Sequence, residues 1–459
     1  MKTLSIYKRC LLGSLTLLFT SCEKLVEVED PTNQLNTQQV FSSTATAQSA
    51  LSALYTEMQM SSLLSGGNFG AGALLGSYAD DLDGYNINAT NAATDLYNNI
   101  QTPSNTAVNA VWTNAYKEIY MANAIIAGIG RSVAIPASDA KRIKGEAMVL
   151  RSIIYFYLSQ IFGDVPYTTV TDYAVNQSLT KTSADEVLDN ISLDLVEAVT
   201  MLEDNYRNPE RIFVNRKTAE LSLALVYSRQ GKWSDAEALL GRVVQSPMYT
   251  WQPDIARTFK KESGNIIFQL KPVIAGNATP EAMLYYFYSS DPRDYAASQD
   301  LISSFEPQDL RLQKWFEKVN SGQRTYYKIN KYKTISQNND ECSVVFRLEE
   351  AYLLLAQAHA EQGKVLQSLA YLNPVRLKAG LPALQTNISV EDLKTEVLNE
   401  SRREFFTERG IRFLHLKRSG KLEMLSIAKP NWKSFHALWP LPVSELSLNP
   451  NLNPQNNGY

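Results

Sequence analysis

LSLALVYSRQGKWSDAEALL, residues 221–240, is matched 132 residues later by LLLAQAHAEQGKVLQSLAYL, residues 353–372. In both stretches a helical apolar pattern runs into Gln-Gly-Lys, and a second helical pattern follows. Gly231 and Gly363 would end the first helices in left-handed caps, and a small residue such as Ala224 would let the paired helices approach closely. The chain therefore contains an internal repeat of helix pairs, which must stack on neighbours to bury their apolar faces.

Helical periodicity continues on both sides of this repeat. The spacing of Ala224, Gly231, Ala236 and Leu240 resembles the tetratricopeptide pattern, with weaker copies in residues 106–162. The predicted fold is all-α, mainly helical, with such pairs in an interrupted right-handed superhelix and few strands. Helix pairs are expected near 106–162, 215–245 and 347–379; the helices are predicted over 37–58, 106–130, 138–162, 183–203, 215–231, 234–245, 347–362, 365–379 and 389–408, and the strands over 266–270 and 326–329.

Two segments lack the helical periodicity: residues 60–105 and residues 272–340. The first is rich in Gly, Asn, Ala and Thr, and the second mixes Pro and Asp with many aromatic residues. Long loops in a compact protein are usually functional or disordered, and this aromatic content argues against disorder. Residues 66–72, GGNFGAG, match no phosphate-binding loop, and we expect a flexible loop there.

The composition excludes several classes of protein. The chain has 459 residues, of which 44% are hydrophobic and 20% charged, as in ordinary globular proteins. A net charge of −3 shows no excess of basic residues of the kind that nucleic-acid-binding proteins carry. Three cysteines cannot build a disulfide framework, and three histidines leave little room for a zinc enzyme.

The first residues predict secretion and a lipid anchor. Lys2, Lys8 and Arg9 precede an apolar run too short to span a bilayer, so residues 1–21 are interpreted as a signal peptide. Residues 19–22, FTSC, resemble a bacterial lipobox, in which Cys22 is lipidated and becomes the first residue. An acidic tether over residues 22–36 would follow, leading to a single helical domain over 37–459. The alternative is plain secretion with an incidental cysteine.

Catalytic motifs were sought and not found: the chain has no Gly-x-x-x-x-Gly-Lys-Ser/Thr, Gly-x-Ser-x-Gly or His-Glu-x-x-His. Residues 81–84, DLDG, have part of a calcium-loop spacing, but a turn with exposed carboxylates is the favoured interpretation. Cys342 is interpreted as an inert thiol. We therefore expect no enzyme activity and no cofactor beyond the lipid on Cys22, with a bound calcium ion as the open alternative.

Short motifs occur along the whole chain: PTNQ (31–34), KGEAMVLR (144–151), FGDVP (162–166), RREFF (402–406), GIRF (410–413) and LWPLP (438–442). Together they resemble the SusD/RagB family of Bacteroidetes outer-membrane lipoproteins. Two departures occur, at His415, where the family usually has Asp, and at Asn457, where it usually has Pro. Arg151, Glu404 and Arg412 lie in these motifs, and we expect them to form ion pairs that brace helices.

The resemblance implies a function and a location. Such proteins lie at the cell surface, lipid-anchored in the outer membrane, as lids on a SusC-like TonB-dependent porin. They capture a nutrient, often an oligosaccharide and sometimes a peptide, without converting it. A surface glycoside hydrolase or peptidase and a purely structural assembly scaffold remain as alternatives. The tetratricopeptide-like helices are the expected porin-facing surface.

Ligand contacts in the family come mainly from irregular segments outside the repeats. Aromatic faces would stack on sugar rings, and polar side chains would bind the hydroxyls. We therefore predict ligand-binding residues in both loop-rich segments; the alternatives are local core or porin interface. The predicted residues are Tyr78, Asp80, Asp81, Tyr85, Tyr288, Arg293, Trp315 and Tyr327.

Overall fold

A computed structural model describes residues 37–85 and 92–459. The predicted signal peptide, the acidic tether and Cys22 lie outside the described residues. Within the described part of the chain, no helix is both long enough and apolar enough to cross a bilayer.

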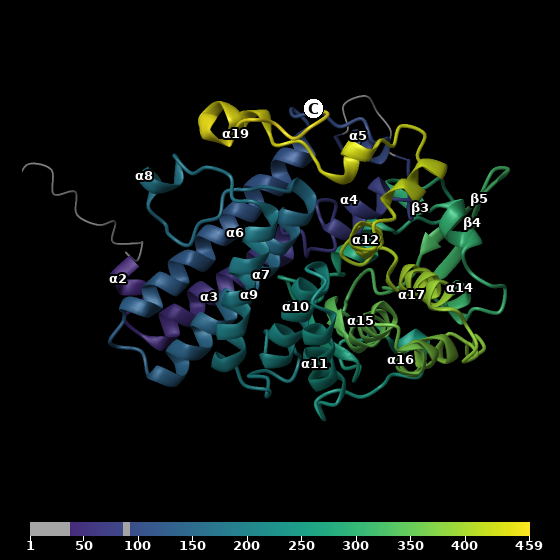
Figure 1. The fold of residues 1–459 in the computed structure, drawn as a ribbon, viewed down its shortest axis with the longest axis horizontal. Coiled ribbons are helices and arrows are strands. Elements are labelled where there is room, and N and C mark those ends of the chain that lie inside the picture. The colour runs from purple at the N-terminus through teal and green to yellow at the C-terminus, as the bar shows by residue number, and fades with distance from the viewer. Residues whose placement is uncertain (1–36, 86–91) are drawn as a thin grey trace, which may run out of the picture.

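A row of helices forms the body of the molecule, and each packs on the next along the chain. The helices α11 and α15 are in contact although about a hundred residues separate them in sequence, so the repeat is interrupted in the chain but continuous in space. In chain order, the row (Figure 1) consists of α6 (Thr106–Arg131), α7 (Ala137–Phe162), α9 (Ala184–Met201), α10 (Arg216–Arg229), α11 (Trp233–Val244), α15 (Leu348–Glu361), α16 (Val365–Lys378) and α17 (Val390–Phe405).

The predicted all-α fold of helix pairs is confirmed, and the glycine caps are part of the reason. Gly231 and Gly363 have φ values of +72° and +71°, the left-handed conformation that closes the first helix of each pair. The helix predicted over 37–58 is divided into α2 (Thr37–Val40) and α3 (Thr44–Met60). The first piece ends at Val40, and Ser43 caps the second by accepting a hydrogen bond from the Thr46 N–H at 3.2 Å.

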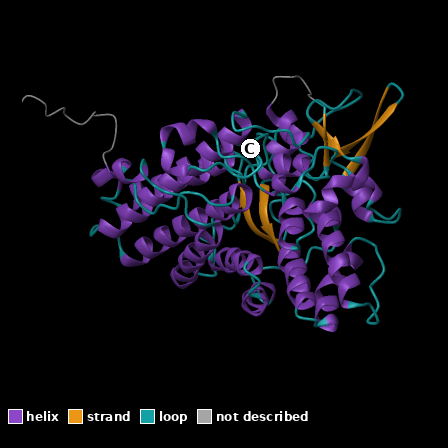
Figure 2. Cartoon of the chain, turned by 45° about the horizontal axis from the view of Figure 1, so that its top comes forward, coloured by secondary structure: helices purple, strands orange, loops and turns teal. Residues whose placement is uncertain are grey.

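Shorter helices and three two-stranded antiparallel ribbons complete the fold (Figure 2). The ribbons are β1 (Leu82–Gly84) with β3 (Tyr295–Ala297), β2 (Ile266–Leu270) with β6 (Ser343–Arg347), and β4 (Phe316–Ser321) with β5 (Arg324–Ile329). The other α-helices are α4 (Ala71–Tyr78), α5 (Ala92–Tyr97), α8 (Tyr173–Asn176), α12 (Pro280–Leu284), α13 (Gln299–Ser303), α14 (Leu310–Lys314), α18 (Ile411–Arg418) and α19 (Val443–Leu448). Both predicted strands are present, as β2 and β5, whereas the sequence did not reveal the other four.

The prediction of a flexible loop over residues 66–72 is wrong for the last two residues, Ala71 and Gly72, because they form the start of α4. Gly72 explains the difference: a Cβ atom there would lie 2.2 Å from the carbonyl oxygen of Thr407. The missing side chain lets α4 pack directly against the backbone that follows α17.

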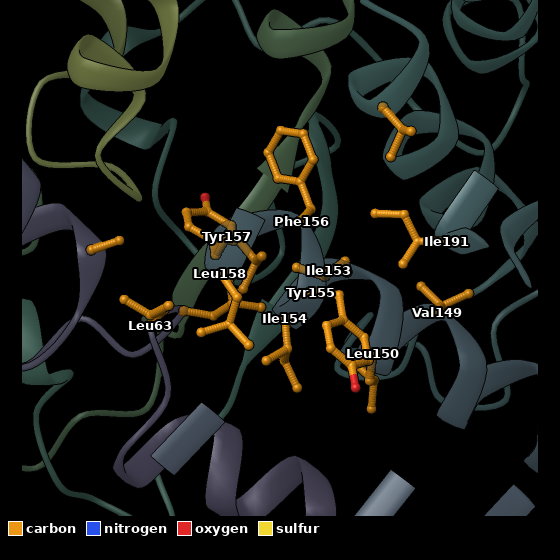
Figure 3. Close-up of a cluster of buried hydrophobic side chains, with 14 of the residues drawn as sticks. Leu63, Val149, Leu150, Ile153, Ile154, Tyr155, Phe156, Tyr157, Leu158 and Ile191 are labelled. Atoms are coloured by element: carbon orange, nitrogen blue, oxygen red, sulfur yellow. The ribbon is translucent and has the colours of Figure 1, made fainter. Parts of the chain in front are cut away.

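The largest hydrophobic cluster centres on α7, which packs against α6, α9, α3 and α10. From Ile143 to its end at Phe162, α7 is buried almost all round, as expected for a helix surrounded by others. Figure 3 shows its side chains from Val149 to Leu158 pointing to several sides, with Leu63 and Ile191 approaching from neighbouring elements.

A buried ionic cluster joins α17 to the loop-rich region. Arg311, on α14, lies 2.9 Å from Glu404, 2.7 Å from Glu400 and 2.8 Å from Asp309. Arg347, at the end of β6, lies 2.5 Å from the other oxygen of Glu404. Although burial alone would raise it, Arg347 and Arg311 lower the pKa of Glu404 to about 2. The carboxylate is therefore charged at neutral pH and fully paired.

The three residues expected to brace helices do form ion pairs, each with its own partner. Arg151 joins α7 to Asp194 on α9 at 2.6 Å. Glu404 pairs with Arg347 and Arg311, as described above. Arg412, on α18, pairs with Asp80 at 2.6 Å. The structural interpretation of these residues is confirmed.

Replacing Arg311 with Met should lower the free energy of unfolding by about 3–5 kcal/mol. The substitution leaves the buried Asp309 without an ion pair to any described residue, and it removes one of the partners of Glu400 and of Glu404. Urea unfolding followed by circular dichroism measures this change. The matched control is Arg324→Met, at an exposed position, which should leave the unfolding midpoint unchanged. Equal midpoints for Arg311→Met and the parent chain would contradict a stabilising role for the cluster.

Candidate functional site

The two loop-rich segments meet through the β1–β3 ribbon. Leu82 pairs with Ala297 and Gly84 with Tyr295, and the Tyr85 N–H donates to the carbonyl of Asp294 at 2.9 Å. The pairing brings together residues that lie more than two hundred positions apart. It places residues 82–85, in the middle of the first segment, directly beside the second.

A cleft of about 300 Å³ lies beside this ribbon. Its volume is at the lower end of the range for small-molecule sites. Both loop-rich segments and the start of α6 contribute to its wall. The described lining residues are Asn68, Phe69, Leu74, Gly84, Tyr85, Ala92, Ala93, Thr94, Tyr97, Thr106, Ala107, Arg293, Asp294 and Tyr295.

Four aromatic residues line the cleft, the buried Tyr295 and three more accessible ones, Phe69, Tyr85 and Tyr97. Phe69 is 47% exposed, so its ring is open to solvent. Tyr85 is half-buried and packs edge-on against Tyr326, with 5.3 Å between ring centroids. Tyr97 is also half-buried, and the ammonium of Lys429 lies 3.9 Å from its ring centroid. Supported rings of this kind offer a surface on which a flat apolar face can stack.

Polar groups surround these rings. The Tyr97 hydroxyl donates to the carboxylate of Asp83 at 3.1 Å, which fixes the orientation of the tyrosine. The Arg293 guanidinium reaches the Asp294 carboxylate at 3.2 Å, but its side chain remains 81% exposed. It therefore keeps donors for a ligand.

Burial changes the protonation of the cleft groups. Burial and, to a smaller extent, the nearby Asp83 carboxylate raise the pKa of the Tyr85 hydroxyl to about 12. The hydroxyl is therefore neutral at physiological pH and can both donate and accept a hydrogen bond. Burial also lowers the pKa of Lys429 to about 8.

The chemistry available in the cleft is stacking and hydrogen bonding. Among residues 37–85 and 92–459, no cluster of three or more His, Cys, Asp or Glu side chains could hold a metal ion. Cys342 is buried, and burial raises the pKa of its thiol to about 12, which makes it a poor nucleophile.

Two of the predicted ligand-binding residues, Tyr85 and Arg293, line the cleft. The structure thus brings together one candidate from each loop-rich segment. Tyr288 is 70% exposed and follows α12, but it is not part of the described cleft lining. Tyr327 is half-buried on β5, where it pairs with Lys318 of β4, and it also lies outside the described lining.

Asp80 and Asp81 are buried in ion pairs, so they cannot touch a ligand at the surface of this structure. Asp80 accepts two hydrogen bonds from Arg412, at 2.8 and 2.6 Å, and Asp81 accepts one from Arg402 at 3.0 Å. Although burial works in the opposite direction, Arg412 and Arg402 hold the pKa of Asp80 below its ordinary value. The two carboxylates join the α4–β1 connection to α17 and α18.

Tyr78 and Trp315 are also enclosed by protein. The Tyr78 hydroxyl donates to the carbonyl of His436 at 2.9 Å, and its ring packs against Trp432 and Trp439. The Trp315 indole donates to the carbonyl of Ile255 at 3.1 Å. The prediction that these two rings bind a ligand is corrected to a packing role.

Sequence reasoning missed Phe69, Asn68 and Tyr97 as lining residues. Phe69 and Asn68 lie in the glycine-rich stretch that we interpreted as a flexible loop. An aromatic residue between glycines was the available signal, since nothing local would bury its ring. Tyr97 carried no distinguishing signal, because its place in the wall depends on the packing of α5 beside β1.

Comparison with known proteins places the chain in a family. Residues 27–227 match the family described as "Starch-binding associating with outer membrane", and residues 316–459 match the SusD family (SusD_RagB). The chain belongs to the SusD/RagB family. It is similar to two SusD-like proteins of Formosa agariphila, P38 and P2, each 25% identical, with 95% and 97% of this chain covered and 95% and 98% of theirs.

Solved structures share the SusD-like fold. A laminarin-binding SusD-like protein superposes with a TM-score of 0.78 at 22% identity, over 90% of this chain and 99% of that one. Surface glycan-binding protein A from Bacteroides thetaiotaomicron, in complex with laminarihexaose, superposes with a TM-score of 0.75 at 18% identity, over 90% of this chain and 100% of that one. At these identities the likeness shows the fold alone.

Replacing Asp80 with Asn should destabilise this SusD-like chain by about 2–4 kcal/mol, because Arg412 loses its buried counter-charge. Arg402 loses one of three carboxylate partners and keeps Asp81 and Asp300. Chemical denaturation measures the change. The control is Asp291→Asn, at an exposed position near the cleft, which should leave stability unchanged. An unaltered unfolding curve together with weakened ligand binding would return Asp80 to the binding site.

Proposed function

We propose that this protein is a cell-surface nutrient-binding lipoprotein that captures an oligosaccharide and passes it to a SusC-like TonB-dependent outer-membrane transporter. The observation that carries the proposal is the cleft between the loop-rich segments, with an exposed phenylalanine, supported tyrosines and a largely exposed arginine. The two glycan-binding structural relatives support the choice of an oligosaccharide. Their names do not identify the glycan that this chain binds.

The cleft suits a sugar for physical reasons. The C–H faces of a pyranose ring can stack on Phe69 and Tyr85, while the hydroxyls bind Arg293 and the neutral Tyr85 hydroxyl. The groups that meet the ligand bind and orient it. We propose binding without conversion, so that the sugar leaves the cleft unchanged.

Isothermal titration with laminarihexaose and a panel of other oligosaccharides tests the site. For an oligosaccharide that binds, Phe69→Ala and Tyr85→Ala should each weaken affinity at least tenfold, about 1.4 kcal/mol at 25 °C. Tyr173→Ala is the matched control, since Tyr173 is an exposed tyrosine outside the cleft and should leave affinity unchanged. Binding that survives both cleft substitutions would contradict this location, and binding of peptides alone would favour the peptide alternative.

The membrane anchor is tested separately. In the parent chain, labelled palmitate should be incorporated at Cys22, and protease added to intact cells should degrade the protein. Replacing Cys22 with Ala should remove the label and release the protein from the membrane fraction, because acyl-chain burial contributes about 0.8 kcal/mol per CH₂ group. Ser21→Cys in the Cys22→Ala background is the control for position. A Cys22→Ala protein that stays in the membrane would contradict the lipid anchor.

A further inference from the structure

A second hollow lies away from the cleft, between α6, the segment leading through α8, and α19. Its volume is about 410 Å³. In Figure 1, α8 and α19 lie at the upper left, near α6. We call it the α6–α19 groove. Its rim carries exposed apolar side chains, with Tyr173 and Leu448 each 78% exposed and Tyr120 54% exposed.

The walls of the α6–α19 groove are fixed to one another. The Tyr116 hydroxyl donates to the carbonyl of Pro166 at 2.7 Å, and the Asn123 amide donates to the carbonyl of Thr168 at 3.0 Å. On the other side, the Asn449 amide donates to the carbonyl of Leu179 at 2.8 Å. These bonds hold the groove open without a ligand, so binding there costs little reorganisation.

One charged side chain, that of Glu445, lies among the apolar residues of the α6–α19 groove. Among the described lining residues, Glu445 alone is ionisable to a full charge at neutral pH, and it forms no ion pair with any described residue. Its half-buried carboxylate accepts a hydrogen bond from the Trp112 indole, and burial raises its pKa. A carboxylate removed from water and lacking a counter-charge is stabilised by a cation.

Two amide side chains in the groove wall, Asn123 and Asn176, are already occupied. Asn123 accepts a hydrogen bond from Arg151 at 2.6 Å in addition to the one that it donates. Asn176 donates to Val170 and accepts from Thr168. A sugar chain needs several free donors and acceptors, which these amides do not offer. The groove therefore favours a ligand with one cation and an apolar stem over a polyhydroxylated one.

We propose that the α6–α19 groove binds a polypeptide segment that inserts one lysine or arginine side chain against Glu445. The aliphatic stem of that side chain fits the apolar walls, and aromatic rings such as Tyr120 and Tyr173 attract its charged end. The exposed apolar rim meets the neighbouring residues of the same segment. This site is separate from the cleft and does not depend on glycan binding.

Titration with two matched peptides tests the proposal: acetyl-Leu-Lys-Leu-amide and acetyl-Leu-norleucine-Leu-amide, which differ in the charge. The lysine peptide should bind saturably and at least tenfold more tightly. Glu445→Gln should reduce its affinity at least tenfold, whereas Glu262→Gln, at an exposed acid elsewhere, should leave it unchanged. Equal binding of the two peptides, or unchanged binding to Glu445→Gln, would overturn the proposal.

Further variants locate the site. Tyr173→Ala, at a position too exposed to be needed for folding, should weaken the lysine peptide several-fold, and Tyr85→Ala in the cleft should not affect it. Loss of peptide binding in Tyr85→Ala would place the peptide in the cleft and overturn the proposal. If Tyr173→Ala lost binding of an oligosaccharide that the parent chain binds, the groove would be a glycan site, and the proposal would be overturned as well.

Discussion

The buried ionic cluster around Glu404 is the constraint on which the rest of the structure depends. Charges taken out of water are costly unless each is paired, and here one carboxylate is shared by Arg347 and Arg311. The first arginine ends β6 and leads into α15, and the second lies on α14. A single residue of α17 thereby fixes both the helical row and the second loop-rich segment.

The first loop-rich segment is held to the same helices by different charges. Asp80 pairs with Arg412 on α18, and Asp81 pairs with Arg402 on α17. Because both segments are joined to the α17–α18 region, the three-residue strands β1 and β3 can meet although such short ribbons are marginal alone. The cleft is a consequence of this double attachment, since its wall is formed where the two segments meet.

The sequence predicted the helical row well because the helical signal is local. Periodicity and the glycine turns placed α10 and α11 within one or two residues of their bounds, and the tertiary contacts then only add to a local preference. The cleft could not be predicted in the same way. Strand β1 forms by pairing with β3, which lies more than two hundred residues away. The sequence near residue 82 gives no sign of that partner. The chemical type of a residue likewise did not show whether its side chain faces a ligand or an arginine of α17 or α18.

Asp80 and Tyr85 show how similar positions in the sequence can differ in what their side chains contact. Both lie in one short polar and aromatic stretch, and both have side chains that suit a sugar. At Asp80 the carboxylate points inward to two arginines, whereas five residues later, beyond β1, the Tyr85 ring reaches the cleft. The buried ion pairs of Asp80 position the Tyr85 ring, because β1 can present Tyr85 to the cleft only while the preceding turn is held to α17 and α18. Substitutions at Tyr85 can therefore alter what the cleft binds without loosening the fold, while those at Asp80 cannot.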